Sequence, residues 1–181
     1  MKHYTAMRLI TPLLAAALLS ACAYPEPQGG AAMPLVNSAG ETVGTVTAWE
    51  TEGGVGLRLQ AAGLPHGVHG IHVHAVGRCE GPKFESAGPH WNPASRKHGL
   101  SNPAGPHGGD LPNVTVAANG TLSATLSVPA TSLSAGAGSL LDADGAALVL
   151  HAAADDNVTD PSGNSGDRIA CAVLQPTSVR Y

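Results

Sequence analysis

Two histidines separated by one residue stand in the stretch GIHVHAVG, residues 70–77. Side chains alternate between the two faces of an extended strand, so His72 and His74 point to one face while Ile71 and Val73 point to the other. Two imidazoles held side by side can bind one cation. Neutral imidazole nitrogens suit copper and zinc. This stretch therefore indicates a strand that contributes two ligands to a metal ion.

Other potential ligands are spread along the rest of the chain. They are His90, His98, His107 and His151, with Asp110 three residues after His107. An isolated histidine is more often a hydrogen-bonded polar residue than a ligand, but six in a chain with only 12% charged residues favour metal binding. A carboxylate beside a histidine cluster suits a closed tetrahedral zinc site. Composition alone does not assign each histidine to a metal.

Short alternating segments predict the elements that must position these ligands. In VGLRLQA, residues 55–61, apolar side chains alternate with Arg58 and Gln60, and TLSATLSV, residues 121–128, repeats the pattern after a tight turn at Asn119-Gly120. Further strands are expected at about 31–37, 43–50, 67–74, 113–116, 146–151 and 169–175. Seven or eight short strands with turn signals between them predict an antiparallel sandwich or barrel.

Two polar segments interrupt this pattern, at residues 77–111 and 152–168. Neither can bury much apolar surface, and loops of this length inside a compact domain are usually functional or held by an external constraint. A metal ion and a disulfide are the constraints that this composition offers.

The N-terminus is typical of an exported lipoprotein. Lys2 and Arg8 precede an apolar run, Leu9–Leu19, that is too short to span a bilayer, and the run ends in LLSAC, which resembles a bacterial lipobox. We therefore expect a lipoprotein signal peptide at 1–21, a lipid on Cys22, a flexible tether over 22–30, and one domain over 31–181. A plain signal peptide is the alternative.

The cysteines and the charge agree with export. With Cys22 acylated, Cys79 and Cys171 remain as one disulfide candidate in an oxidising compartment, the alternative being two buried thiols. Removal of Lys2 and Arg8 leaves seven basic residues against thirteen acidic ones. This excess of negative charge argues against nucleic acid as a partner.

Five segments carry a resemblance to a known family. GVHGIHVHAVG, SAGPHWNPASRKHG, PHGGDLPNV, LVLHAAADD and SGDRIACAV follow one another in the order seen in copper/zinc superoxide dismutases. The resemblance covers about residues 31–176, essentially the whole predicted domain. It implies an all-β fold: an eight-stranded antiparallel Greek-key β-barrel or sandwich with two long functional loops.

The resemblance also implies a role for each candidate residue. One copper per subunit would be bound by His72, His74, His90 and His151, and one zinc by His90, His98, His107 and Asp110. His90 would then bridge the two metals as an imidazolate. Asp155 matches an aspartate that hydrogen-bonds a copper ligand and a zinc ligand, here His72 and His98. Cys79 and Cys171 match the disulfide of the family, and Arg168 matches the arginine beside the copper.

The implied activity is dismutation of superoxide to dioxygen and hydrogen peroxide by a redox-cycling copper next to a structural zinc. His90 would carry a proton to the product, and Arg168 would attract and orient the anion. The enzyme would work in the periplasm, anchored by its lipid to a membrane. There it would protect the cell envelope from superoxide. The outer membrane is favoured because Ala23, rather than an aspartate, follows Cys22.

The sequence departs from eukaryotic members in its charges. Ala75 replaces a common glutamate, and residues 152–167 contain no lysine. Lys83, Arg96 and Lys97 are candidates to replace the missing positive charge. The alternative is that each is an ordinary solvated charge.

Two other functions fit parts of the pattern. A periplasmic copper- or zinc-storage module would need the histidines but not a positioned Arg168 or a bridging His90, and a lipid-anchored structural domain would need only zinc to hold its loops. The sequence leaves open whether the chain is a monomer or a homodimer. No metal is expected on His69, which should face away from His72, or on His66, which should be solvated. Trp91 is expected to pack rather than to carry electrons.

Overall fold

The computed structural model describes Met1 and residues 31–134 and 138–175. Its elements in chain order are β1 (Met33–Asn37), β2 (Thr42–Thr51), β3 (Gly54–Ala61), β4 (Gly67–His69), β5 (Ile71–His74), the short 3-10 helix η1 (Glu85–Ala87), β6 (Val114–Val116), β7 (Leu122–Pro129), β8 (Ala146–His151) and β9 (Arg168–Leu174). The predicted signal peptide, the lipid on Cys22 and the tether lie outside the described residues.

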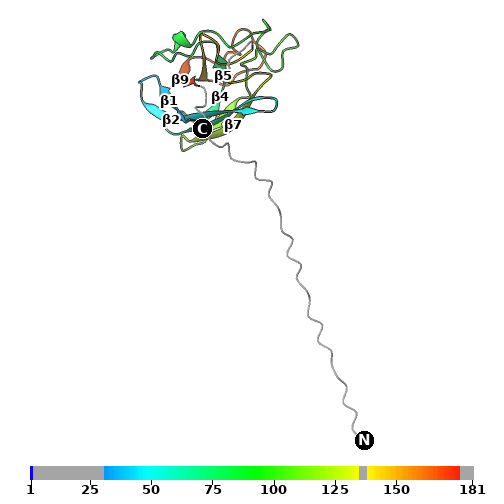
Figure 1. Cartoon of the computed structure of the whole chain (residues 1–181). Helices are drawn as coiled ribbons and strands as arrows, with labels where there is room; N and C mark the ends of the chain where they lie inside the picture. The colour runs from blue at the N-terminus through cyan, green and yellow to red at the C-terminus, as the bar shows by residue number, and fades with distance from the viewer. Residues whose placement is uncertain (2–30, 135–137, 176–181) are drawn as a thin grey trace.

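Seven of these strands form one curled sheet, in the order β5-β8-β9-β1-β2-β3-β7, while β4 pairs with β6. Every strand pair is antiparallel. Strands far apart in the chain, such as β1 and β9, lie side by side (Figure 1). The predicted all-β, antiparallel architecture is confirmed, and no described segment is a helix long and apolar enough to cross a membrane.

Alternation along the strands builds the core. In β3 the side chains of Val55, Leu57 and Leu59 are buried, whereas Gln60 is exposed. The expected alternation in β7 is also present, because Leu122 and Val128 are buried at its ends. These faces pack together with apolar residues of β1, β2, β5 and β8 in one core cluster. In β7 the residues of the opposite parity, Ser123, Thr125 and Ser127, are left for solvent, whereas β5 and β8 are buried on both faces.

The strand expected over residues 67–74 is divided at Gly70, which gives nine strands rather than eight. β4 pairs with β6 on one side of Gly70, and β5 pairs with β8 on the other. The Gly70 N–H donates to the Ala153 carbonyl at 2.8 Å, so its backbone is engaged by the second long loop. A Cβ on Gly70 would lie 2.9 Å from Cβ of Ser165. The chain therefore passes between two sheets at a residue that has no room for a side chain.

The turn predicted at Asn119-Gly120 is present, but it does not close a regular hairpin. Gly120 has φ +78, and its N–H donates to the Ala117 carbonyl at 2.9 Å. The strands on either side of the turn pair with different partners, β6 with β4 and β7 with β3. The dipeptide thus predicted the local turn and not the pairing beyond it.

The two long loops also stand where the sequence predicts them. The first joins β5 to β6 and contains η1, and the second joins β8 to β9. In Figure 1 the first loop, in green, lies on the side of the sheet where β5 and β9 are labelled. Both loops therefore reach the strands that carry His72, His74 and His151.

Candidate metal centre

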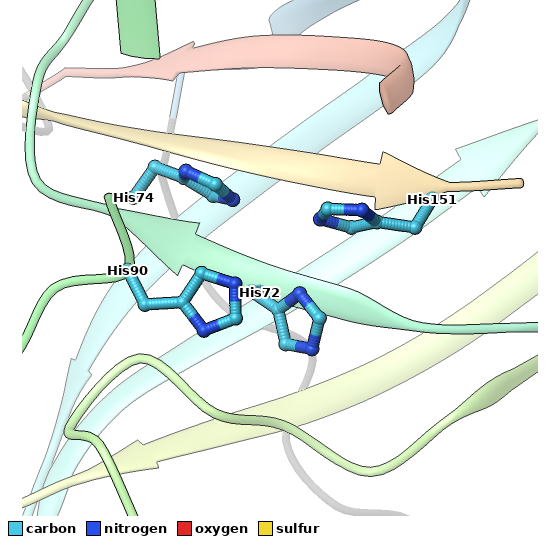
Figure 2. A group of neighbouring side chains, drawn as sticks. All are labelled: His72, His74, His90 and His151. Carbon is cyan, nitrogen blue, oxygen red and sulfur yellow. The ribbon is translucent and has the colours of Figure 1, made fainter. Parts of the chain in front are cut away.

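Two neighbouring strands and one loop bring four histidines together. β5 carries His72 and His74, β8 ends at His151, and the register pairs His72 with Val149 and His74 with Ala147. Figure 2 shows these three rings and that of His90, from the first long loop, turned toward a common space. All four side chains are buried. The expected grouping of His72, His74, His90 and His151 is therefore present.

The first long loop reaches this place because parts of it pair with the free edge of β5. The Val73 N–H donates to the Gly109 carbonyl, and the Trp91 N–H donates to the Val73 carbonyl, both at 2.8 Å. These bonds set His90 opposite His74 and Asp110 opposite His72. A Cβ on Gly109 would collide with the Val73 carbonyl oxygen, so the close approach requires glycine.

One nitrogen of each of the four rings is free of hydrogen bonds. Within the described residues, these atoms are buried and have no partner: Nδ1 of His72 and Nε2 of His74, His90 and His151. The ring nitrogen on the far side is engaged in every case; Nδ1 of His74 lies 2.8 Å from the Gly88 carbonyl, and Nδ1 of His151 lies 3.1 Å from that of Gly166. A carbonyl accepts a hydrogen, so it leaves the opposite nitrogen with its lone pair.

The electrostatics keep three of these rings neutral. Burial is the main cause that lowers the pKa of His74 to about 2, that of His151 to about 3 and that of His90 to about 4, and the neighbouring imidazoles act in the same direction. Four converging imidazoles whose ligand atoms lie within 4.8 Å of one another match the needs of a transition-metal ion. The donor set therefore fits copper or zinc, although its nitrogens alone do not choose between them.

A second group shares His90 with the first. Its members are His90, His98, His107 and Asp110, with ligand atoms again within 4.8 Å of one another. Oδ1 of Asp110 lies 2.9 Å from Nδ1 of His90, 3.1 Å from Nδ1 of His98 and 3.2 Å from Nδ1 of His107. Three imidazoles and one carboxylate are a donor set that suits tetrahedral zinc. His90 faces this group with Nδ1 and the first group with Nε2.

Backbone groups hold Asp110 in place. Its Oδ2 accepts from the Gly99 N–H at 2.8 Å and from the His107 N–H at 2.9 Å. Burial raises the pKa of Asp110, but the hydrogen bonds with His90, Gly99 and His107 outweigh it, so the pKa lies below its usual range. The carboxylate is therefore charged, as a metal ligand must be.

Asp155 connects the two groups as predicted. Its Oδ2 lies 2.6 Å from Nε2 of His72, and its Oδ1 lies 3.0 Å from Nε2 of His98. Burial opposes ionisation, yet the hydrogen bonds with these two rings bring the pKa of Asp155 down to about 2. A charged carboxylate in this position fixes the hydrogen on Nε2 of each ring.

Arg168 stands across from His151 at the beginning of β9. Nη1 donates to the Phe84 carbonyl at 2.7 Å, and Nη2 donates to the Gly88 carbonyl at 2.8 Å. The side chain lines a cavity of about 930 Å³ that is also lined by His74, His90 and His151. Burial lowers the pKa of Arg168 and nearby Glu85 raises it, which leaves a positioned cation beside the four histidines.

Lys83, Arg96 and Lys97, the candidates to replace the positive charge missing from the second long loop, lie in two different places. Arg96 and Lys97 line the same cavity as Arg168, and Nζ of Lys97 lies 2.9 Å from Oδ2 of Asp160. Lys83 lies against a neighbouring hollow instead, and its Nζ is 4.0 Å from Oε1 of Glu85. Arg96 and Lys97 therefore remain candidates to attract an anion, and Lys83 is set apart from the cavity.

A disulfide joins Cys79 to Cys171 across 92 residues of sequence. This pairing was predicted, and it rules out the alternative of two buried thiols. Cys171 lies in β9 and Cys79 in the first long loop, five residues before Phe84, whose carbonyl accepts from Arg168. The bond therefore fastens the loop segment that holds the guanidinium.

His69, His66 and Trp91 have the surroundings that the sequence predicts. His69 is buried and outside both groups; its Nδ1 lies 2.8 Å from the His151 carbonyl and its Nε2 lies 2.9 Å from that of Pro65. His66 is exposed, and Trp91 is part of the apolar core. None of the three contributes to either ligand group among the described residues.

Two residues near the site have no counterpart in the sequence predictions. Asp160 accepts from the His98 N–H at 2.8 Å, and Asn113 hydrogen-bonds the backbone of Asp155. The first contact joins the first long loop to the second. The other joins the residue just before β6 to the second loop. The partners are separated by 62 residues in one case and 42 in the other, so no local spacing could reveal them.

Comparisons with known proteins agree with this geometry. Residues 42–174 match a family model described as copper/zinc superoxide dismutase. A protein of Aquifex aeolicus named copper-zinc superoxide dismutase 2 is 40% identical over 171 residues, which cover 93% of this chain and 100% of that protein. The copper-zinc superoxide dismutase of Caulobacter vibrioides is 44% identical over 139 residues, covering 75% of this chain and 80% of that protein.

Solved structures show the same fold. A SOD-like protein from Bacillus subtilis is 41% identical, with a TM-score of 0.77, and the match covers 81% of this chain and 99% of that one. The copper/zinc superoxide dismutase from Brucella abortus is 28% identical, with a TM-score of 0.65 and coverage of 81% and 99%.

Proposed function

The chain belongs to the copper/zinc superoxide dismutase family, and on that premise we propose that its two ligand groups divide the metals as the sequence predicts. His72, His74, His90 and His151 bind copper; His90, His98, His107 and Asp110 bind zinc. One observation carries this assignment: a single imidazole, that of His90, has Nε2 in the first group and Nδ1 in the second. The enzyme dismutates superoxide to dioxygen and hydrogen peroxide.

The metals supply chemistry that the protein lacks, because bound copper changes oxidation state reversibly while zinc does not. The side chains supply position, charge and protons. Arg168 is held by two carbonyls and still lines the cavity, so its guanidinium can bind a small oxyanion next to the four histidines. Nε2 of His90 is the position at which a proton can be held and passed to the product.

The storage alternative makes a different prediction for Arg168. Arg168→Glu should slow superoxide disappearance by about 10-fold or more, Arg168→Lys should slow it much less, and both should retain wild-type copper and zinc. Added salt should slow the wild type by screening its attraction for the anion, and should slow the Glu variant less or even speed it. The assay needs protein loaded with both metals, together with a metal analysis of each variant.

The results of this assay distinguish a dismutase from a metal-storage protein. If the Glu variant keeps its metals and its full rate at low salt, Arg168 does not guide substrate. If the wild type is also slow while it holds both metals, the storage function is favoured instead. Loss of activity on copper removal with the fold retained would support the enzyme.

We also propose that the protein works in the periplasm, anchored by a lipid on Cys22 in the outer membrane, where it removes superoxide from the cell envelope. LLSAC at residues 18–22 and Ala23 support the anchor and its membrane, and the Cys79–Cys171 disulfide suits an oxidising compartment. Mass spectrometry of the mature N-terminus tests the anchor. Cys22→Ser, behind a signal that another peptidase cleaves, should release an active soluble enzyme. Sedimentation of the mature protein would decide between a monomer and a homodimer, which the sequence leaves open.

A further inference from the structure

The side-chain amide of Asn113 makes a two-point contact with the backbone of Asp155. Nδ2 donates to the Asp155 carbonyl at 2.8 Å, and the Asp155 N–H donates to Oδ1 at 2.8 Å. The paired donor and acceptor imitate one hydrogen-bonded pair of an antiparallel sheet, with a side-chain amide in place of a peptide. The contact therefore fixes both the position and the direction of the chain at Asp155.

The position of Asp155 matters because its carboxylate serves two rings at once. Oδ2 lies 2.6 Å from Nε2 of His72, and Oδ1 lies 3.0 Å from Nε2 of His98. Hydrogen bonds weaken steeply as their distance and angle depart from ideal values. A small displacement of the Asp155 backbone would therefore release one ring or the other, and each ring belongs to a different ligand group.

The space around this carboxylate is fully used. A Cβ on Gly163 would overlap the carboxylate of Asp155 and lie 2.8 Å from Nε2 of His98, and a Cβ on Gly70 would lie 3.2 Å from Cβ of Asp155. The glycines leave just enough room for the carboxylate but make no side-chain bond that could hold it. Asn157 donates its N–H to Oδ1 of Asp155 at 2.6 Å and its Nδ2 to the Asp155 carbonyl at 3.1 Å, but among the described residues Asn113 is the side chain that accepts from the Asp155 N–H.

We propose that Asn113 is a positioning residue for both metal sites, which holds Asp155 where one carboxylate can orient His72 and His98 together. Among the described residues, its side chain hydrogen-bonds to Asp155 and to no ligand histidine. Zinc retention and copper geometry would thus depend on a residue that touches neither metal. This inference rests on the proposed function, because it takes the two ligand groups as copper and zinc sites.

Zinc release from the copper- and zinc-loaded protein into excess chelator tests the inference directly. Asn113→Ala should release zinc about 10–100-fold faster than the wild type, the range for loss of a residue that supports metal ligands. The visible and EPR spectra of its Cu(II) should also shift, because the His72 ring is no longer fixed. Asn113→Asp keeps the acceptor and the shape but turns a carboxylate oxygen toward the Asp155 carbonyl, so zinc release should again accelerate, and this variant carries the test if the alanine variant does not fold.

The matched control is Asn37→Ala, which removes a similar amide from the β1–β2 turn. Asn37 donates to Glu41 at 2.9 Å and accepts from the Glu41 N–H at 2.9 Å. Its loss tests whether a general decrease in stability can by itself speed zinc release or alter the copper spectrum. Wild-type release and an unchanged spectrum in this variant would attribute the Asn113 effects to Asp155.

A double-mutant cycle shows whether Asn113 acts through Asp155. In an Asp155→Ala background there is no carboxylate to position, so adding Asn113→Ala should not accelerate zinc release further. Wild-type release and an unchanged copper spectrum in both Asn113 variants would overturn the inference, and so would an equal acceleration in the Asp155→Ala background. A wild type that does not bind both metals would instead count against the proposed function.

Discussion

The two ligand groups are built on different kinds of backbone. Three of the four proposed copper ligands, His72, His74 and His151, stand on paired strands whose hydrogen-bond ladder sets their spacing. Every proposed zinc ligand lies in the first long loop, where only two short pairings with β5 replace a ladder. The sheet therefore fixes three of the copper ligands, while the zinc side depends on contacts between loop residues.

Those contacts are polar and depend on one another. Asp110 reaches His90, His98 and His107, and the backbone of His98 is in turn held by Asp160 of the second loop. Such a network has little apolar surface to stabilise it, so a metal ion and a disulfide must supply part of the constraint. The comparison predicts a rigid copper side and a zinc side that responds to the loss of any constraint.

The largest effect is expected from His90→Ala, since His90 belongs to both sides. Dismutation should fall far beyond the 10–100-fold typical of a lost supporting residue, because the variant removes one ligand from each metal and the proposed proton carrier. Zinc binding should weaken, with three protein ligands left, and the domain should stay folded. His66→Ala, an exposed histidine, is the control. Near-native activity of His90→Ala would refute the bridging role.

The next effect concerns the disulfide that fastens the zinc-side loop to β9. Replacing Cys79 and Cys171 by serine should lower the free energy of unfolding by about 3–5 kcal/mol, on the chain-entropy estimate for a long closed loop. Denaturant titration measures this change. Zinc should also be retained less firmly than copper, since the loop carries the zinc ligands. Equal weakening of both metals would show that the two sides are not held differently.

Metal removal should separate the two sides more directly. In the metal-free protein, amide hydrogen exchange should quicken by about 10-fold or more in residues 77–111, while β5 and β8 keep their protection, because sheet hydrogen bonds open only with larger unfolding events. Mass spectrometry of peptides from the two regions gives both rates in one sample. Comparable acceleration in β8 would contradict the claim that the sheet fixes the three copper ligands that stand on strands.

The pH dependence of the metal-free protein tests the copper side separately. His74, His90 and His151 have folded-state pKa values of about 2, 4 and 3, against an ordinary value of 6.5. Between pH 6.5 and about 4 the unfolded chain binds protons that the folded chain does not, so stability should fall as pH decreases, by up to about 1.4 kcal/mol per pH unit for each histidine.

The carboxylate of Asp110, in the first long loop, titrates in a lower pH range than these histidines would in the unfolded chain. The pKa of Asp110 is below its ordinary 3.8, so its stabilising contribution is present above that value and is lost only at lower pH. His151→Gln should therefore flatten the stability profile between pH 6.5 and 4 and leave the acid limb unchanged. Urea titrations across the pH range measure both. An unchanged slope in this variant would show that His151 is not kept neutral by folding.

The sequence by itself determined much of this protein. Alternation in residues 55–61 and 121–128 predicted half-buried strands, and the parity of His72 and His74 placed both rings on one face, because an extended chain has a side-chain period of two whatever surrounds it. The ordered motifs then implied the ligand groups, the role of Asp155 and the disulfide. All of these follow from local geometry or from a resemblance carried by contiguous residues.

Only the tertiary structure decided what depends on segments far apart in the chain. The break at Gly70 exists because the second loop passes against it, and the turn at Gly120 leads into a different sheet because β7 finds its partner in β3. The contact between Asn113 and Asp155 has the same origin. These two residues are 42 positions apart in the chain and meet where two loops converge. Local periodicity cannot encode such meetings, because they are set by the packing of the whole sheet.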